Sequence, residues 1–174
     1  GRVRYEIDAK MYPYSHPYSW SPIGSMDDLN VASLEDIRNW YRTYYGPNNA
    51  VLSLAGDITP ERALALVNKY FGAIPPGPPL PRIATWIPKL DRDIRDEMED
   101  HVPQARIYRS YHAPAWKDPE LQHLGLFGDV LTGSRASALP RRLVYEKGLA
   151  TAANSYVSDG ELGSTFNIVV TVKP

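Results

Sequence analysis

The sequence has no cysteine, which excludes disulfide bridges, thiolate zinc sites and a cysteine nucleophile. It also has no run of about 18 consecutive apolar residues, so no membrane-spanning segment is predicted. Basic and acidic residues nearly balance, 19 against 20, and the net charge is -1. A nucleic-acid-binding protein needs a basic excess to neutralise phosphates, so nucleic acid is not an expected partner.

Several catalytic motifs are also missing. None of the four histidines starts the inverted zinc motif H-x-x-E-H, and H-E-x-x-H does not occur. There is no G-x-S-x-G nucleophile elbow and no glycine-rich phosphate loop followed by the required lysine. We therefore assign no catalytic residue and no metal ligand in this chain, and the substrate-binding residues stay unknown.

Proline, in contrast, is abundant, with 16 in 174 residues. Each proline ring fixes φ and removes a hydrogen-bond donor, so a cluster of prolines predicts a stiff, extended connection. Residues 75–90 are therefore predicted to link two partial domains, 1–74 and 91–174. The cluster consists of Pro75, Pro76, Pro78, Pro79, Pro81 and Pro88.

Before this linker, the pattern predicts helix, loop, helix, strand and helix. A helix is expected over residues 3–11, followed by a proline-rich loop over 12–22. Ser33, with Asp36 three residues later, has the pattern of a capping box that starts the next helix, which Gly46-Pro47 ends. The apolar run 49–55 predicts a buried strand. Thr59-Pro60 starts another helix, and Gly72 stops it.

After the linker, alternating polarity predicts strands over residues 94–100 and 104–112, the second more strongly. Asp118-Pro119 opens a helix that runs to about Leu131, and a further helix is expected within 134–147, after Pro140. Residues 149–158 and 164–172 predict two antiparallel strands joined at 159–163. The fold class is therefore α/β of the mixed, α+β kind, with partly antiparallel sheets and helices packed on them.

Three segments carry a resemblance to a known family when they are read in their order and spacing. Together they resemble the pitrilysin/insulinase zinc metallopeptidases, which include the mitochondrial processing peptidases, and they cover residues 14–158. The segments are Pro17-Tyr18 with Tyr44-Tyr45-Gly46-Pro47-Asn48-Asn49 and Ala55-Gly56-Asp57; Val102-Pro103-Gln104-Ala105-Arg106 with Tyr111-His112-Ala113-Pro114; and Leu131-Thr132-Gly133-Ser134 with Arg142-Leu143-Val144-Tyr145-Glu146-Lys147-Gly148-Leu149-Ala150.

The resemblance implies tandem α/β domains that form half of a clamshell enclosing peptide. The chain would supply the end of one domain and the beginning of the next. Family members hold zinc through H-x-x-E-H and a later glutamate, and the family pattern places these ligands before Gly1. We therefore expect zinc in the parent protein and none in this chain. The family's substrate-polarising arginine and tyrosine belong to a later domain and are assigned to no residue here.

Some residues invite a site assignment, but each also has a structural interpretation. Glu120 and His123 are spaced like metal ligands on a helix, yet such sites need further glutamates. His101 and His112 flank a predicted strand and fit structural histidines better than ligands. A triad drawn from Ser15-His16, Ser110 and Asp57 has no support from any motif. Tyr14, Tyr18 and Trp20 either line a peptide chamber or pack on the domain, and packing is favoured. The tract 164–170 is expected to be an inner strand rather than an edge that binds peptide.

The resulting hypothesis is a structural, substrate-chamber fragment of a zinc-dependent metalloendopeptidase that hydrolyses peptides, with the fragment itself inactive. The alternative is part of a non-catalytic, peptide-binding partner subunit of the same family. An unrelated α/β interaction module would require the three segments to be coincidental. The expected partners are peptide substrate and the remaining domains of the same chain or a partner subunit. A bacterial periplasm or cell-envelope location is the expectation from the resemblance.

Overall fold

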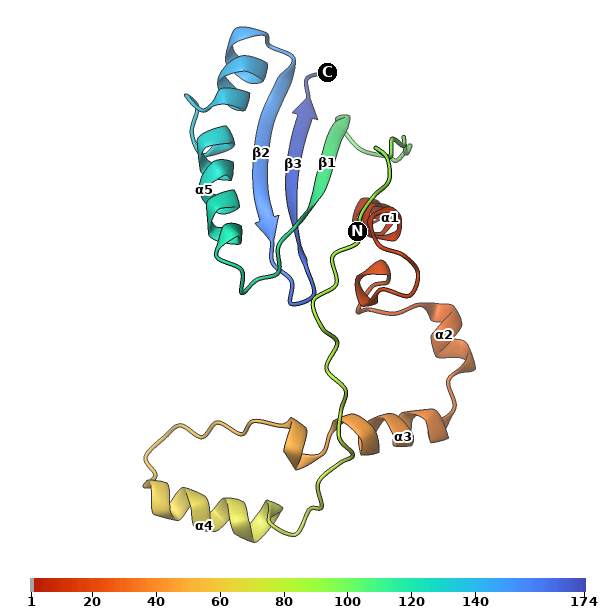
Figure 1. The fold of residues 1–174 in the computed structure, drawn as a ribbon, viewed down its shortest axis with the longest axis vertical. Coiled ribbons are helices and arrows are strands. Elements are labelled where there is room, and N and C mark those ends of the chain that lie inside the picture. Colours follow the sequence, from red (N-terminus) through yellow and green to blue (C-terminus); the bar gives the residue numbers. More distant parts are fainter. Residues whose placement is uncertain (1) are drawn as a thin grey trace. The chain divides into compact units, whose positions relative to one another are not determined.

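The computed structural model describes residues 2–174, and these form two compact units. Residues 2–22 and 83–174 make up the first unit, and residues 23–82 make up the second. The first unit holds the β-sheet, and the second is built from helices and extended chain (Figure 1). The two partial domains predicted at 1–74 and 91–174 concern the parent protein's organisation and stay a prediction.

The sheet of the first unit has three strands in the order β1-β3-β2, all antiparallel. The strands are β1 (Arg106–Ala113), β2 (Ala150–Ser158) and β3 (Ser164–Val172). β3 therefore lies in the centre, which confirms the prediction of an inner strand over 164–170 and of the antiparallel hairpin. The observed mixture of helices with an antiparallel sheet confirms the predicted α/β class.

Helices lie on both faces of this sheet (Figure 1). On one face is α5 (Glu120–Thr132), whose Phe127 ring lies 5.8 Å from the Phe166 ring of β3. On the other face is α1 (Arg2–Met11), where the imidazole Nε2 of His112 lies 3.0 Å from the Met11 carbonyl oxygen. The predicted helices over 3–11 and from 118 to about 131 are both confirmed.

The outer edge of β2 is covered by the end of α5. The Ser155 main-chain N–H donates to Thr132 Oγ1 at 2.9 Å, and the Ser155 hydroxyl donates to the Gly128 carbonyl at 3.1 Å. A Cβ on Gly128 would lie 3.3 Å from the Ser155 hydroxyl, so the small residue allows this close approach. The hydroxyl of Thr132 thus satisfies a donor that an edge strand would otherwise leave unpaired.

The helix expected after Pro140 is present, but it is a π-helix, η3 (Pro140–Glu146). Its last turn closes through the Lys147 N–H, which donates to the Arg142 carbonyl five residues earlier. Gly148 follows with φ of 60°, a left-handed conformation that glycine adopts without a Cβ penalty. This geometry turns the chain directly into β2.

The second unit contains α2 (Met26–Val31), α3 (Leu34–Tyr44) and α4 (Pro60–Phe71). Both capping predictions are confirmed. The Ser33 hydroxyl accepts from the Asp36 N–H, and the Ser33 N–H donates to the Asp36 carboxylate at 2.9 Å, while Thr59 caps α4. Hydrogen bonds to Ser33 lower the pKa of Asp36.

Two strand predictions were wrong. Residues 50–55 are extended but unpaired and exposed, with Val51 94% exposed, because the described part of the second unit has no strand beside them. Residues 94–100 also form no strand. A strand exists only where a neighbour satisfies its main-chain groups, and neither an apolar run nor alternating polarity supplies such a neighbour.

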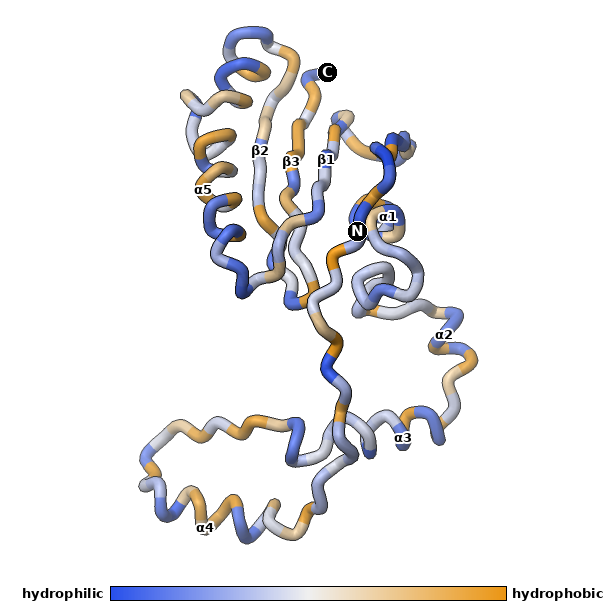
Figure 2. The backbone as a smooth tube through the Cα atoms, in the orientation of Figure 1, coloured by the Kyte–Doolittle hydropathy of each residue, from blue (hydrophilic) through white to orange (hydrophobic). Residues whose placement is uncertain are grey.

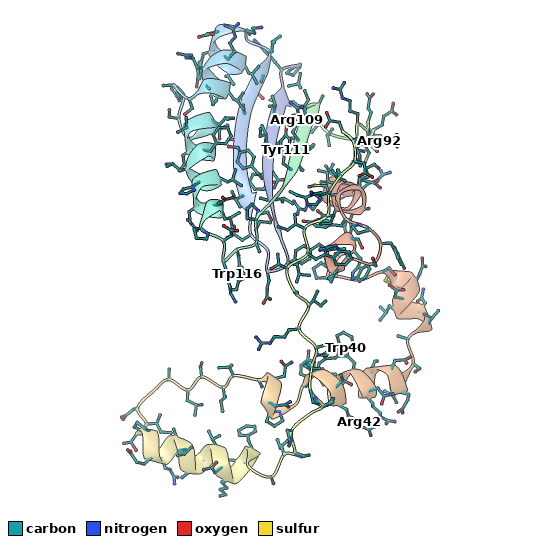
Figure 3. The ribbon with its side chains drawn as sticks, viewed as in Figure 1. Trp40, Arg42, Arg92, Arg109, Tyr111 and Trp116 are labelled. Carbon is teal, nitrogen blue, oxygen red and sulfur yellow. The ribbon has the colours of Figure 1, made fainter. Side chains whose placement is uncertain are left out.

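The apolar faces of α3 and α4 have helical spacing, as predicted, but the structure leaves them exposed. Ile37 is 48% exposed and Leu64 is 62% exposed. Trp40 and Arg42 project from α3 in Figure 3, and the apolar residues of α4 show as separate orange segments in Figure 2. The second unit therefore contains no element that covers the apolar faces of α3 and α4 in its described residues.

The proline-rich segment is extended, as expected, and its start is fastened inside the second unit. Asn48 Nδ2 donates to the Gly77 carbonyl at 3.1 Å, and the Gly77 N–H donates back to Asn48 Oδ1 at 2.7 Å. A Cβ on Gly46 would collide with the Gly77 main chain. The Asn48 side chain thus gives the main chain of Gly77 the two hydrogen bonds that a neighbouring strand would otherwise provide.

Candidate functional site

A group of aromatic side chains in the first unit surrounds the buried ring of His16. The ring of His16 is fully buried, and ring centroids of Tyr12, Tyr18 and Trp86 lie 4.6, 5.2 and 4.5 Å from it. His112 adds an edge-on contact with Tyr12 at 5.1 Å. We call these five residues, Tyr12, His16, Tyr18, Trp86 and His112, the aromatic junction.

Local sequence explains how the junction is built. His16 precedes the short 3-10 helix η1 (Pro17–Ser19) and caps it, because its Nδ1 accepts the Tyr18 main-chain N–H at 3.0 Å. An Nδ1 that accepts must be unprotonated, so the Nε2 nitrogen carries the hydrogen and donates to the Trp86 carbonyl at 2.9 Å. Both nitrogens of this imidazole are therefore committed to main-chain groups.

The turn between β2 and β3 packs against the junction. The Leu162 N–H donates to the Tyr18 hydroxyl at 3.2 Å, and the Trp86 N–H donates to the Leu162 carbonyl at 2.8 Å. A Cβ on Gly160 would collide with the Gly163 carbonyl oxygen and would lie 2.9 Å from a ring carbon of Tyr18. The absence of a side chain at Gly160 thus lets the hairpin approach the aromatic rings.

Burial sets the acid–base behaviour of the junction. Burial raises the pKa of Tyr12 to about 12, with a smaller contribution from the nearby Asp8 carboxylate. Burial also lowers the pKa of His112, although its hydrogen bond to Met11 partly opposes this. At neutral pH these two side chains are therefore uncharged, so their packing in the junction buries no charge.

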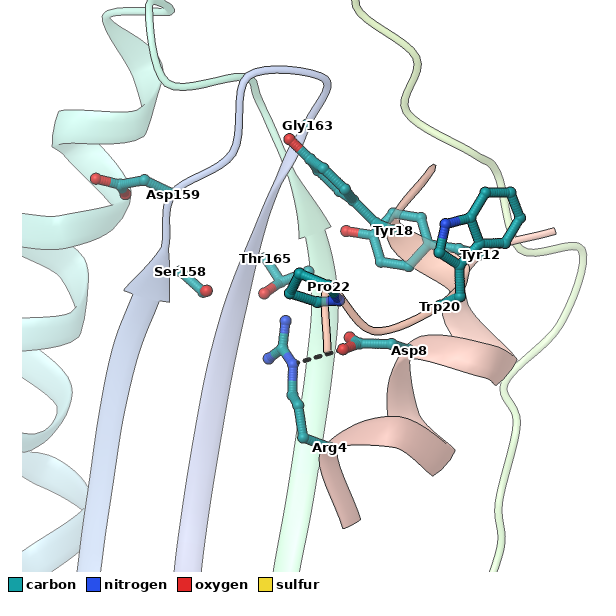
Figure 4. A pocket seen from close by; sticks show the side chains of 10 residues that line it. All are labelled: Arg4, Asp8, Tyr12, Tyr18, Trp20, Pro22, Ser158, Asp159, Gly163 and Thr165. Carbon is teal, nitrogen blue, oxygen red and sulfur yellow. Dashed lines mark hydrogen bonds and ion pairs between the residues drawn. The ribbon is translucent and has the colours of Figure 1, made fainter. Parts of the chain in front are cut away.

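A pocket of about 190 Å³ opens beside the junction, and Figure 4 shows its lining. Arg4 and Asp8 of α1 contribute two of the three charged groups of the lining, with Arg4 Nε donating to Asp8 Oδ2 at 2.8 Å. Burial raises the pKa of Asp8 despite this arginine. The remaining lining is Tyr12, Tyr18, Trp20, Pro22, Ser158, Asp159, Gly163 and Thr165.

The residues singled out from the sequence do not come together in one site. His16 and His112 enter the junction, whereas His123 is exposed on α5. Ser110 donates to Asn167 Oδ1 at 2.7 Å, so its hydroxyl is bound within the sheet. Asp57 belongs to the second unit.

The aromatic loop residues divide between packing and exposure. Tyr18 packs as favoured from the sequence, but Tyr14 is 90% exposed and touches only Trp20 among the ring contacts of the described residues. Sequence reasoning missed Trp86 of the junction and the Arg4–Asp8 pair. The i, i+4 spacing of that pair was a usable signal.

The described residues do not fit a zinc site. Within 2–174, no group of three or more histidine, cysteine or carboxylate side chains is placed to hold a metal ion. His16 uses both ring nitrogens for main-chain contacts and so offers no free lone pair in this arrangement, while His112 uses its Nε2 for the Met11 carbonyl. The expectation that this chain binds no zinc stays a prediction for experiment.

The fold and the junction thus define a mixed α/β scaffold. The family profile described as the peptidase M16 inactive domain matches residues 32–174. The chain therefore belongs to the peptidase M16 inactive-domain family, which confirms the resemblance to pitrilysin/insulinase-type metallopeptidases.

Named relatives agree with this assignment. The zinc protease PqqE of Helicobacter pylori is 31% identical over 162 residues, which is 90% of this chain and 36% of that protein. A solved peptidase M16 inactive domain from Pseudomonas fluorescens has a TM-score of 0.78 at 20% identity, covering 99% of this chain and 41% of that one. The periplasmic protease PqqL of Escherichia coli has a TM-score of 0.68 at 17% identity, covering 99% of this chain and 20% of that one. The chain thus spans about a third of the length of the Helicobacter protease that it matches.

Proposed function

We propose that the chain is a non-catalytic scaffold of a larger zinc-dependent metalloendopeptidase, whose zinc ligands lie in residues outside this chain. Membership of the inactive-domain family and similarity to a named zinc protease support this. In this proposal the sheet and its helices form part of the wall around a peptide-binding chamber. The chain itself carries out no chemical step.

The buried imidazole of His16 is the observation that carries the proposal. Its two nitrogens hold the loop at 12–20 to the segment at Trp86, and it is 0% exposed. A catalytic or metal-binding histidine needs a nitrogen that faces substrate or ion. An imidazole committed on both sides stabilises architecture instead.

Zinc analysis and a cleavage assay test this proposal. After equilibrium dialysis against zinc, the chain should retain less than one equivalent and should cleave no unstructured peptide. The full-length parent should retain zinc and cleave the same peptides. Stoichiometric zinc on the 174-residue chain, with peptide cleavage that a chelator stops, would overturn the assignment.

A second candidate is a non-catalytic partner subunit that completes a peptide chamber while another chain supplies zinc. It is favoured by one relative, a probable mitochondrial-processing peptidase subunit beta of Schizosaccharomyces pombe, 24% identical over 111 residues. The two candidates differ in the parent sequence. H-x-x-E-H in the parent supports the enzyme, and its absence there supports the partner subunit.

The location proposed for the parent is the bacterial periplasm or cell envelope. Support comes from the periplasmic protease of Escherichia coli that shares this fold. In the described residues, no helix is both long and apolar enough to cross a membrane. Fractionation of cells that produce the tagged parent tests the location, and recovery in the cytoplasmic fraction would contradict it.

A further inference from the structure

Positive charge is concentrated at the connection between α5 and β2, in a chain whose net charge is -1. The π-helix η3 carries Arg141 and Arg142, and Lys147 follows directly after it. Lys173, the residue after β3, lies beside this connection, because its main-chain N–H donates to the Leu149 carbonyl at 2.9 Å. All four side chains are exposed. We call Arg141, Arg142, Lys147 and Lys173 the basic turn.

Among residues 2–174, a single carboxylate forms ion pairs with the basic turn. Glu146 Oε2 accepts from Arg142 Nη1 at 3.0 Å, and Glu146 Oε1 lies 3.5 Å from Arg141 Nε. The π-type winding brings these three side chains together, since its turns close five residues apart. The basic turn therefore holds four cations against one carboxylate.

The other acidic residues of the first unit do not cancel this excess. Asp129 belongs to α5, and Arg135, in the turn that follows, offsets its charge. The acidic residues within 91–100 precede β1, which forms the edge of the sheet opposite to β2. One of them, Asp96, is already paired with Lys10 of α1 at 2.7 Å. The excess of positive charge at η3 is therefore local.

Glu146 shows which kind of group the basic turn accepts. Its carboxylate lies between two guanidiniums, each of which presents a planar fork of N–H donors that matches carboxylate oxygens. The guanidinium of Arg141 makes only the 3.5 Å ion pair and no hydrogen bond within the described residues, so its donors stay available. Both ion pairs are exposed and contribute little to stability, so a competing carboxylate can replace Glu146 at small cost.

We propose that the basic turn binds an acidic, unstructured segment of a partner protein. One carboxylate of the segment takes the place of Glu146 between Arg141 and Arg142, and Glu146 turns to solvent. Further carboxylates meet the two lysines of the basic turn. Tyr145 and Leu149, both exposed, contact apolar side chains next to those carboxylates. This binding role goes beyond the scaffold role and does not depend on zinc.

Other anionic partners match the basic turn less well. Nucleic acid requires an extended basic surface, and the chain as a whole carries a charge of -1. An anionic membrane attracts lysine and arginine alike, in proportion to their number. The two guanidiniums around Glu146 instead favour a group of the size and shape of a carboxylate. The arginine pair, and not the total charge alone, is therefore expected to determine binding.

Fluorescence anisotropy of labelled peptides, titrated with the 174-residue chain, tests the proposal. The acidic probe is rhodamine-labelled G-S-E-L-E-G-E-L-E-S, and its control has glutamine in place of every glutamate. At low salt the acidic probe should bind with a dissociation constant of about 0.3 mM, and the glutamine probe should not bind. Raising the salt concentration about tenfold should weaken binding at least about fivefold, because exposed charges are screened.

Variants of the arginine pair make the test specific. Arg141→Gln with Arg142→Gln should weaken binding of the acidic probe at least about fivefold. Arg62→Gln with Lys69→Gln, the same loss of two charges on α4, should leave it unchanged. Glu146→Gln should strengthen binding about threefold, because it removes the carboxylate that competes with the probe. A purely structural Glu146 would instead leave the affinity unchanged and lower only the melting temperature.

Two further variants keep the test decisive. Glu99→Gln, the same loss of one negative charge in an exposed segment, should not strengthen binding as Glu146→Gln does. If the double arginine variant does not fold, Lys147→Gln with Lys173→Gln replaces it. This lysine variant leaves both Glu146 ion pairs intact and should still weaken binding at least about threefold.

Several results would overturn the proposal. These are equal binding of the glutamine probe, equal weakening by the α4 variant, and an affinity that Glu146→Gln leaves unchanged or lowers. Co-sedimentation with phosphatidylglycerol vesicles, lost in the double arginine variant and without binding of the acidic probe, would show that the partner is a membrane instead. Stoichiometric zinc or peptide cleavage by the chain would overturn the scaffold proposal and leave this result standing.

Discussion

Replacing His16 by alanine is the sharpest test of the junction, because this one ring joins the loop at 12–20 to the segment at Trp86. The substitution removes a fully buried ring together with two hydrogen bonds, to the Trp86 carbonyl and from the Tyr18 N–H. The cavity costs about 2–4 kcal/mol, and each lost bond adds about 1 kcal/mol, reduced by relaxation around the site. We expect the free energy of unfolding to fall by about 3–5 kcal/mol, which is a large part of the roughly 5–15 kcal/mol that stabilises a typical domain.

The assay is urea unfolding followed by the indole N–H NMR signal of Trp86, which reports on the first unit. His123→Ala is the matched control, since His123 is exposed on α5, and it should change the free energy of unfolding by less than about 0.5 kcal/mol. His16→Asn tests the capping role, because its side-chain oxygen can still accept from Tyr18 and should recover about 1 kcal/mol. A loss below about 1 kcal/mol for His16→Ala would refute the view that this ring holds the junction together.

Three further predictions concern single positions. Gly160→Ala should destabilise the first unit, because the new Cβ would collide with the Gly163 carbonyl oxygen and lie 2.9 Å from a ring carbon of Tyr18. Gly125→Ala, with open space around it in α5, should instead stabilise the unit by up to about 1 kcal/mol in thermal unfolding. Burial lowers the pKa of His112 in the folded chain, so its contribution to the free energy of unfolding should be full above the ordinary histidine range and should be lost as pH drops below about 6.5. His112→Phe should flatten this pH dependence in urea titrations at about pH 5 to 8. An unchanged pH profile in this variant would contradict the role given to His112. Ser33→Ala should cost α3 about 1 kcal/mol through loss of its capping box, visible as reduced helicity by circular dichroism, and no change would contradict the capping role.

Local signals in the sequence predicted the elements whose cause is local. Ser33 and Thr59 start helices because their hydroxyls bond main-chain groups within three residues. The alternation over 104–112 predicted β1, and the two runs joined at 159–163 predicted the hairpin of β2 and β3. The π-type winding after Pro140 was not predictable from the presence of proline, which marks only where a helix starts.

The failures arise where structure depends on distant partners. Residues 49–55 have the composition of a strand, but no strand lies beside them in the described unit. Composition cannot say which neighbour will be present. The junction was missed for a related reason, because Trp86 meets His16 across 70 residues of sequence, and a single sequence carries no signal for that pairing. The Arg4–Asp8 pair, in contrast, was detectable from its i, i+4 spacing.

The arrangement of the first unit has a consequence for how the protein is made. The Tyr18 hydroxyl meets Leu162 across 144 residues, and His112 meets Met11 across 101. Such long-range closure is entropically costly and slows folding. On the ribosome, α1 and the loop after it emerge well before the strands that cover them, so their aromatic rings stay uncovered until translation has passed β3. During that interval these rings stay exposed to solvent, and a chain terminated before residue 164 would lack β3, the central strand of the sheet.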